Sequence, residues 1–113
     1  MSAIAGTALS GHIAVILDEA GHALAADNSI STHGGAVVGI TTGAAALGAS
    51  VSISEKGTLG HIGWTFMPNL PVYLGAAGQI TQTPPIGQFI KVLGMATSAM
   101  RITISIQPAI YVN

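Results

Sequence analysis

Apolar and polar residues alternate in several short stretches of the chain. The clearest is RITISIQ, in which Ile102, Ile104 and Ile106 alternate with Thr103 and Ser105. SVSIS (50–54) and HIGWTFM (61–67) repeat this period of two, which is typical of a strand with one buried face. We expect further strands at 13–17, 36–41 and 89–96. TTGAAALGAS (41–50) has a helix-like composition, but one turn is too short to form a stable helix. The pattern therefore predicts an all-β fold.

The segment PVYLGAAGQITQTPP (71–85) predicts a complete β-hairpin. Residues 72–74 are expected to form a short strand, residues 75–78 a glycine-rich turn, and residues 79–81 the return strand. Pro84 and Pro85 should end that strand, because proline cannot donate to a ladder. The segment holds no charged residue and no histidine, so it has no group for acid-base chemistry.

Two parts of the chain resemble each other. VILDEAG (15–21) matches VYLGAAG (72–78), VVGITTGA (37–44) matches VLGMATSA (92–99), and an alternating strand follows each. We interpret this as two similar halves of one β-sandwich or partly open β-barrel, since each half has an apolar face that needs covering. Chance similarity in a sequence rich in glycine, alanine and valine is the alternative. The expected organisation is a single domain over 1–113, with an N-terminal arm (1–7), a first half (8–54), a connector (55–70) and a second half (71–113).

Gly39 and Gly94 occupy matching places inside the expected strands. Glycine within a strand usually marks a bulge or a close approach of two backbones. We therefore expect a sharp bend at both positions, as a small barrel requires.

The low proportion of charged residues limits the kinds of molecule that the chain can bind. Only 6% of the 113 residues are charged and 50% are hydrophobic, whereas an average soluble domain has about 25% charged residues. Either this is a neutral glycine-rich β domain, or other protein covers much of its surface. The formal net charge of −1 provides no electrostatic attraction to nucleic acid or to an anionic membrane. We also expect no membrane span and no secretory signal, because no apolar run is long enough and the N-terminus lacks positive residues.

Residues that could carry chemistry are few. His12, His22, His33 and His61 follow no short metal-ligand spacing, and the chain has no cysteine, so we expect no metal site. The carboxylates Asp18, Glu19, Asp27 and Glu55 lie where turns are expected. No Gly-x-Ser-x-Gly elbow and no phosphate-binding loop is present. We therefore expect neither an enzyme nor a bound cofactor.

Two segments are candidates for contact with other proteins. Residues 2–7 lack an evident partner within their own half and would fray alone, so we expect them to order against a partner protein or a neighbouring subunit, with Ile4 as the apolar contact. In the connector, large apolar side chains either fill the core or anchor an interface. The candidate contact residues are Ser2, Ile4, Thr7, Trp64, Phe66 and Met67.

The segments VYLGAAGQITQTPP and VLGMATSAMRITISIQPAI, with VVGITTGAAALGASVSI before them, carry a family resemblance over most of residues 8–110. The chain resembles the small capsid decoration (cement) and head-fibre proteins of tailed bacteriophages. It departs from them in Leu93, which precedes the glycine of the second "Val-Gly" strand, and in having no fibre extension after Asn113.

The resemblance implies a non-enzymatic structural protein on the outer surface of the virion, made in the host cytoplasm. Its implied partners are the major capsid protein and copies of itself, often as a homotrimer. The alternative function is a head-fibre base or a host-adsorption module that binds carbohydrate.

Overall fold

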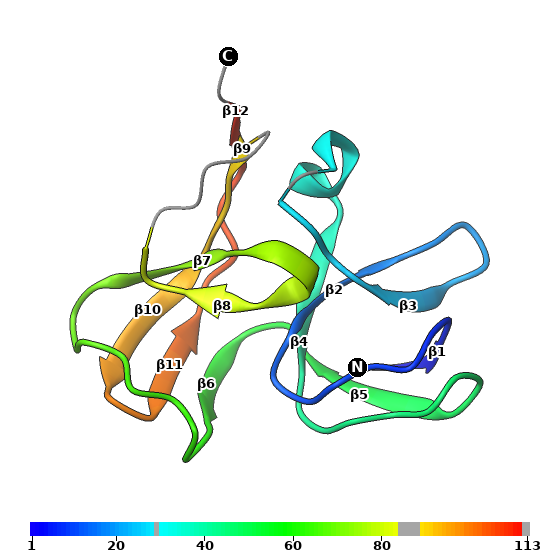
Figure 1. The fold of residues 1–113 in the computed structure, drawn as a ribbon, viewed down its shortest axis with the longest axis horizontal. Helices are drawn as coiled ribbons and strands as arrows, with labels where there is room; N and C mark the ends of the chain where they lie inside the picture. Colours follow the sequence, from blue (N-terminus) through cyan, green and yellow to red (C-terminus); the bar gives the residue numbers. More distant parts are fainter. Residues whose placement is uncertain (29, 84–88, 112–113) are drawn as a thin grey trace.

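The computed structural model describes residues 1–28, 30–83 and 89–111, and it confirms the expected all-β fold. The molecule is flat, with extents of 36 × 35 × 18 Å. A closed five-stranded barrel lies beside a five-stranded open sheet, and a two-stranded ribbon extends from the open sheet (Figure 1).

The first 54 residues supply all the strands of the barrel. Its strand order is β1-β3-β2-β4-β5, with β5 returning to β1, and the 3₁₀ helix η1 (Ser31–Gly35) precedes β4. The strands are β1 (Ser2–Ala5), β2 (Ala14–Leu17), β3 (His22–Ala25), β4 (Val37–Thr41) and β5 (Ser50–Ser54).

The open sheet is built from later residues in the order β6-β11-β10-β7-β8. The short 3₁₀ turn η2 (Ala76–Gly78) joins β7 to β8. The strands are β6 (Gly57–Gly60), β7 (Pro71–Leu74), β8 (Ile80–Thr81), β10 (Val92–Ser98) and β11 (Arg101–Ile104), and the ribbon pairs β9 (Phe89–Ile90) with β12 (Ile110–Tyr111).

The expectation that residues 2–7 have no partner in their own half is wrong. β1 pairs parallel with β3 and antiparallel with β5, and the terminal amine of Met1 donates to the Ile53 carbonyl over 2.8 Å. The small side chains of β1 fit the crowded barrel, in which Ala5 is buried. The closure of the barrel by β1 pairs residues that are far apart in sequence, so no local sequence pattern could predict it.

The internal similarity of the two halves is confirmed by their topology. The strands β1 to β5 and the strands β6, β7, β8, β10 and β11 pair in the same order within each half. Backbone geometry repeats as well: His12 and Asn69 have φ of 60° and 68°, and Gly21 and Gly78 have φ of 82° and 81°. These pairs stand at matching positions, so the halves are two versions of one five-strand unit.

The expected bends at Gly39 and Gly94 are also confirmed. The ladder between β2 and β4 and the ladder between β7 and β10 each shift register beside these glycines. A Cβ on Gly39 would lie 2.5 Å from the Ser54 carbonyl oxygen, and a Cβ on Gly94 would collide with the Thr103 carbonyl oxygen. Only glycine lets these backbones approach so closely.

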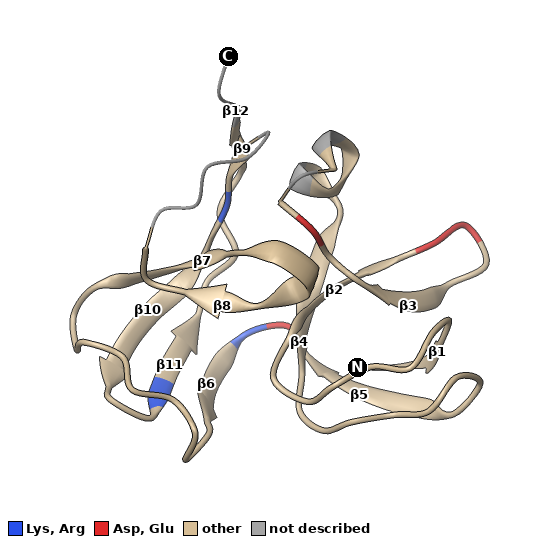
Figure 2. Ribbon diagram, in the orientation of Figure 1, with Lys and Arg blue, Asp and Glu red and all other residues tan. Residues whose placement is uncertain are grey.

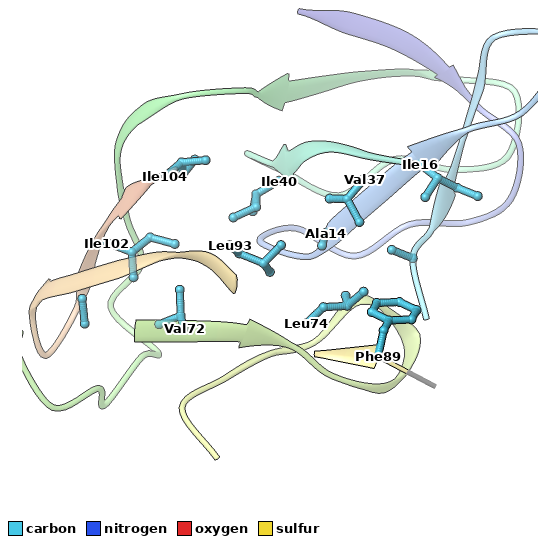
Figure 3. Close-up of a cluster of buried hydrophobic side chains, with 12 residues drawn as sticks. Ala14, Ile16, Val37, Ile40, Val72, Leu74, Phe89, Leu93, Ile102 and Ile104 are labelled. Carbon is cyan, nitrogen blue, oxygen red and sulfur yellow. The ribbon is translucent and has the colours of Figure 1, made fainter. Parts of the chain in front are cut away.

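The halves differ in closure, and this difference creates the larger core. Among the described residues, β6 and β8 are the unpaired edges of the second sheet. The inner face of that sheet, including Val72, Leu74 and Leu93, therefore packs against the outer face of the barrel, where Ile16 and Ile40 lie (Figure 3). A separate small cluster fills the barrel itself: Ala5, Leu9, Val15, Ala23, Val51 and Ile53.

Some expected elements take a different form. Residues 61–67 form turns and irregular backbone in place of a strand, while β6 occupies 57–60. The backbone N–H groups of Trp64 and Phe66 donate to the carbonyls of His61 and Ala99. These hydrogen bonds take the place of a regular strand ladder between residues 61 and 70. Residues 41–50 hold no helix. Pro84 and Pro85 lie outside the described residues.

Candidate interaction surface

Three aromatic rings, one from the loop before β2 and two from the connector, lie in contact. The imidazoles of His12 and His61 stack with centroids 4.1 Å apart and an interplanar angle of 17°. The Trp64 indole stands edge-on to both, at 5.5 Å from each. The cluster therefore joins the loop before β2 to the segment after β6.

Backbone hydrogen bonds hold these rings in place. The His12 N–H donates to the Thr41 carbonyl, and the His61 N–H donates to the Met100 carbonyl, both over 2.8 Å. The left-handed conformation of His12 turns the chain into β2. Beside the rings lies a hollow of about 370 Å³, whose wall includes Thr81 from the edge strand β8 and Gln79, which precedes that strand.

The position of His12 affects its protonation. Burial, and then the neighbouring His61, lower the pKa of His12 below its usual value. Both causes disfavour a charged ring at this place. The cluster is therefore suited to a neutral His12 ring packed as an aromatic group.

The candidate residues of the connector separate into two kinds. Trp64 and Phe66, whose rings are 5.2 Å apart, are partly buried and pack against the main core. Met67 is 65% exposed, and its backbone is clamped by the Gln82 amide, which accepts from Met67 N at 2.7 Å and donates to Met67 O at 2.8 Å. Met67 is thus presented outward on a fixed backbone.

The candidates at the N-terminus lie on the barrel wall. Ile4 is 43% exposed, opposite His22 on β3 and Ser50 on β5. Ser2 and Thr7 are exposed too. Ile4 pairs with β3 and β5 on the barrel, whereas Trp64 and Phe66 pack against the main core. Figure 1 shows β1 and the segment between β6 and β7 on opposite sides of the molecule, so the six candidates do not form one patch.

Two of the remaining ionisable side chains accept hydrogen bonds from the backbone of turns and loops. Asp18 Oδ1 accepts from Ala20 N and His22 N, both at 2.9 Å, and His33 Nδ1 accepts from Asp27 N at 3.0 Å. Within the described part of the chain, no group of three or more histidine, cysteine or acidic residues could hold a metal ion. No helix there has the length and apolarity of a membrane span.

One buried cation was not anticipated. Lys91, at the step from β9 to β10, is only 5% exposed. Burial lowers the pKa of its ammonium group. A lone lysine in an apolar stretch carries no sequence signal for burial, because its long stem usually takes the charge to water.

Large apolar side chains are exposed on the first half, on the connector and on the second half alike. They include Ile62 at 90% and Met95 at 47%. The strands β7, β8 and β10 carry no charged residue, and the few charges lie at strand ends and turns (Figure 2). A groove of about 490 Å³ runs over β7, β10 and β11, lined by Pro71, Val92 and Met95 among other uncharged residues. This groove and the outward residues of the connector are the candidate interaction surface.

Comparison with protein-family models and with curated proteins finds no match. The function must therefore be argued from the fold and its surface.

Proposed function

We propose that the chain is a structural subunit of a phage virion, a decoration protein that binds the outside of the head and stabilises it. The observation that carries the proposal is the exposed apolar surface of the connector and the second half, which includes Ile62, Met67 and Met95, on a small β protein with only 6% charged residues. Exposed apolar surface of this kind marks protein contact. The sequence resemblance gives the kind of partner, which is the major capsid protein, and a homotrimer as the form of the chain on the head.

The described residues suit binding better than catalysis. The ionisable side chains lie mostly in turns, as Asp18 does, and the pair of stacked histidines is packed as a structural element. A protein that only binds needs a stable fold and an exposed contact surface, and the two tightly joined sheets supply both.

Binding to heads tests the proposal. Heads stripped of the chain are mixed with the purified protein, sedimented and then heated while DNA release is followed. Because a ligand of the assembled state stabilises it by mass action, saturated heads should release DNA at a higher temperature than bare heads. Met67→Lys should weaken binding at least about tenfold, which is roughly 1.4 kcal/mol, whereas Thr32→Lys at η1 should bind normally. Absence of binding by the unaltered chain contradicts the proposal.

A second candidate function is carbohydrate binding, in a head-fibre base or adsorption module. The hollow beside Trp64 favours it, since an aromatic ring next to the side chains of Gln79 and Thr81 combines an apolar body with hydrogen-bonding groups. A glycan array decides between the two. Binding of a defined glycan that Gln79→Ala abolishes supports this candidate, and an array without binding above background removes it.

A further inference from the structure

The duplicated unit gives residues on the outer face of the barrel counterparts on the outer face of the second sheet. The matched pairs His12 with Asn69 and Gly21 with Gly78 fix the alignment of β2 with β7. The matched glycines Gly39 and Gly94 fix the alignment of β4 with β10. The resulting counterparts are Ala14 and Pro71, Ile16 and Tyr73, Val37 and Val92, and Ile40 and Met95.

In the first half, this face is fully covered. Ala14 and Ile40 are 0% exposed, and Ile16 and Val37 are also buried. What covers them is a sheet of the same chain, through residues such as Leu74 and Leu93 (Figure 3). The interface between the halves is therefore an apolar sheet face packed on another sheet, as in a sandwich.

In the second half, the same face is open. Met95 is 47% exposed where its counterpart Ile40 is 0% exposed, and Pro71, Tyr73 and Val92 are partly exposed. Together with Thr97 and Thr103, three of these four residues line the groove of about 490 Å³. The second half thus keeps the apolar character of a face that its twin buries.

We infer that a second copy of this chain covers the groove. The first half shows that this type of face is buried by a β-sheet of this same chain. The described residues that line the groove are all uncharged, so two copies can meet there without burying a charge, which would cost free energy. A nearly neutral chain also has little repulsion to keep its copies apart. The inference gives a surface to the self-association within the proposed function, and it does not depend on binding to heads.

The test measures mass in solution without heads. Light scattering and sedimentation equilibrium over a concentration series should show the unaltered chain as an oligomer of the 11.3 kDa subunit. Met95→Lys should weaken self-association at least about tenfold, because it places an ammonium group in the covered groove. Leu47→Lys is the matched control: Leu47 is 71% exposed on the barrel, so this variant should associate like the unaltered chain.

A second variant distinguishes a loss of self-association from a failure of Met95→Lys to fold. Thr103→Lys changes another exposed groove residue on β11, and circular dichroism with a melting curve shows whether each variant is folded. A folded variant that becomes monomeric supports the inference. The inference is overturned if the unaltered chain is a monomer throughout, or if both folded groove variants associate normally. Normal association with lost head binding would assign the groove to the capsid protein instead.

Discussion

At the scale of single residues, the two strand glycines are the most constrained positions. Gly39→Ala and Gly94→Ala each place a methyl group against a backbone carbonyl of the neighbouring strand. We expect each variant to lose roughly 1–3 kcal/mol in the free energy of unfolding, as overpacking does. Urea denaturation measures the loss.

Gly43→Ala is the control for both glycine variants. A Cβ at Gly43 meets no atom within 4 Å, and its φ lies outside the left-handed region. This variant should remain within about 0.5 kcal/mol of the unaltered chain. Equal stability of all three variants would show that the close strand approach is not a constraint.

His12 should make the stability depend on pH. Its pKa is lowered in the folded state, by burial first and by His61 second, so the unfolded chain takes up the proton at the higher pH. Stability is therefore complete above the unfolded pKa of about 6.5 and falls as the pH drops through that value. Denaturation curves between about pH 8 and about pH 5 should show this slope.

His12→Asn is the matched variant for the pH experiment. Asparagine tolerates a left-handed backbone, and Asn69 occupies the equivalent position in the second half with φ of 68°. The variant should fold and should lose part of the acid destabilisation. If its stability changes with pH as steeply as that of the unaltered chain, another group is responsible.

At the scale of elements, β1 decides whether the first half is a barrel. Deleting residues 2–7 removes the strand that bridges β3 and β5 and uncovers the cluster around Val15 and Val51. We expect a loss of several kcal/mol, in line with about 25 cal/mol per Å² of apolar surface exposed. Hydrogen exchange should then increase at the amides of β3.

Ile4→Ser separates the strand from its side chain. It keeps the β1 backbone and changes only a side chain that is 43% exposed, so the fold should survive with a small change in stability. If the deletion leaves a stable barrel and Ile4→Ser weakens head binding, residues 2–7 act as the docking arm that the sequence suggested.

The elements also show which features the sequence could predict. The strands β2, β4, β5 and β11 carry local alternation or β-branched residues, and similar sequence segments in the two halves revealed the duplication. β1 has no such pattern, because its small residues are selected by a parallel contact with β3. The ring stack of His12 on His61 depends on how the halves meet, which spacing does not encode. The groove could have been found by comparing Ile40 with Met95 in the aligned halves.

At the scale of the whole molecule, closure of one half and openness of the other explain the architecture. The barrel fills itself with small residues such as Ala5 and Ala23. The open half uses the barrel as its cover, and so leaves its own outer face, including Met95, in contact with solvent. A chain of this design buries its main core internally and still presents apolar surface for assembly.

The number of copies in each virion tests the central claim most directly. Quantitative mass spectrometry of purified particles, with the major capsid protein as internal reference, gives this number. A decoration protein must be present in hundreds of copies, in fixed proportion to the capsid protein. A handful of copies per particle, or none after purification under conditions where the head stays intact, would contradict the account.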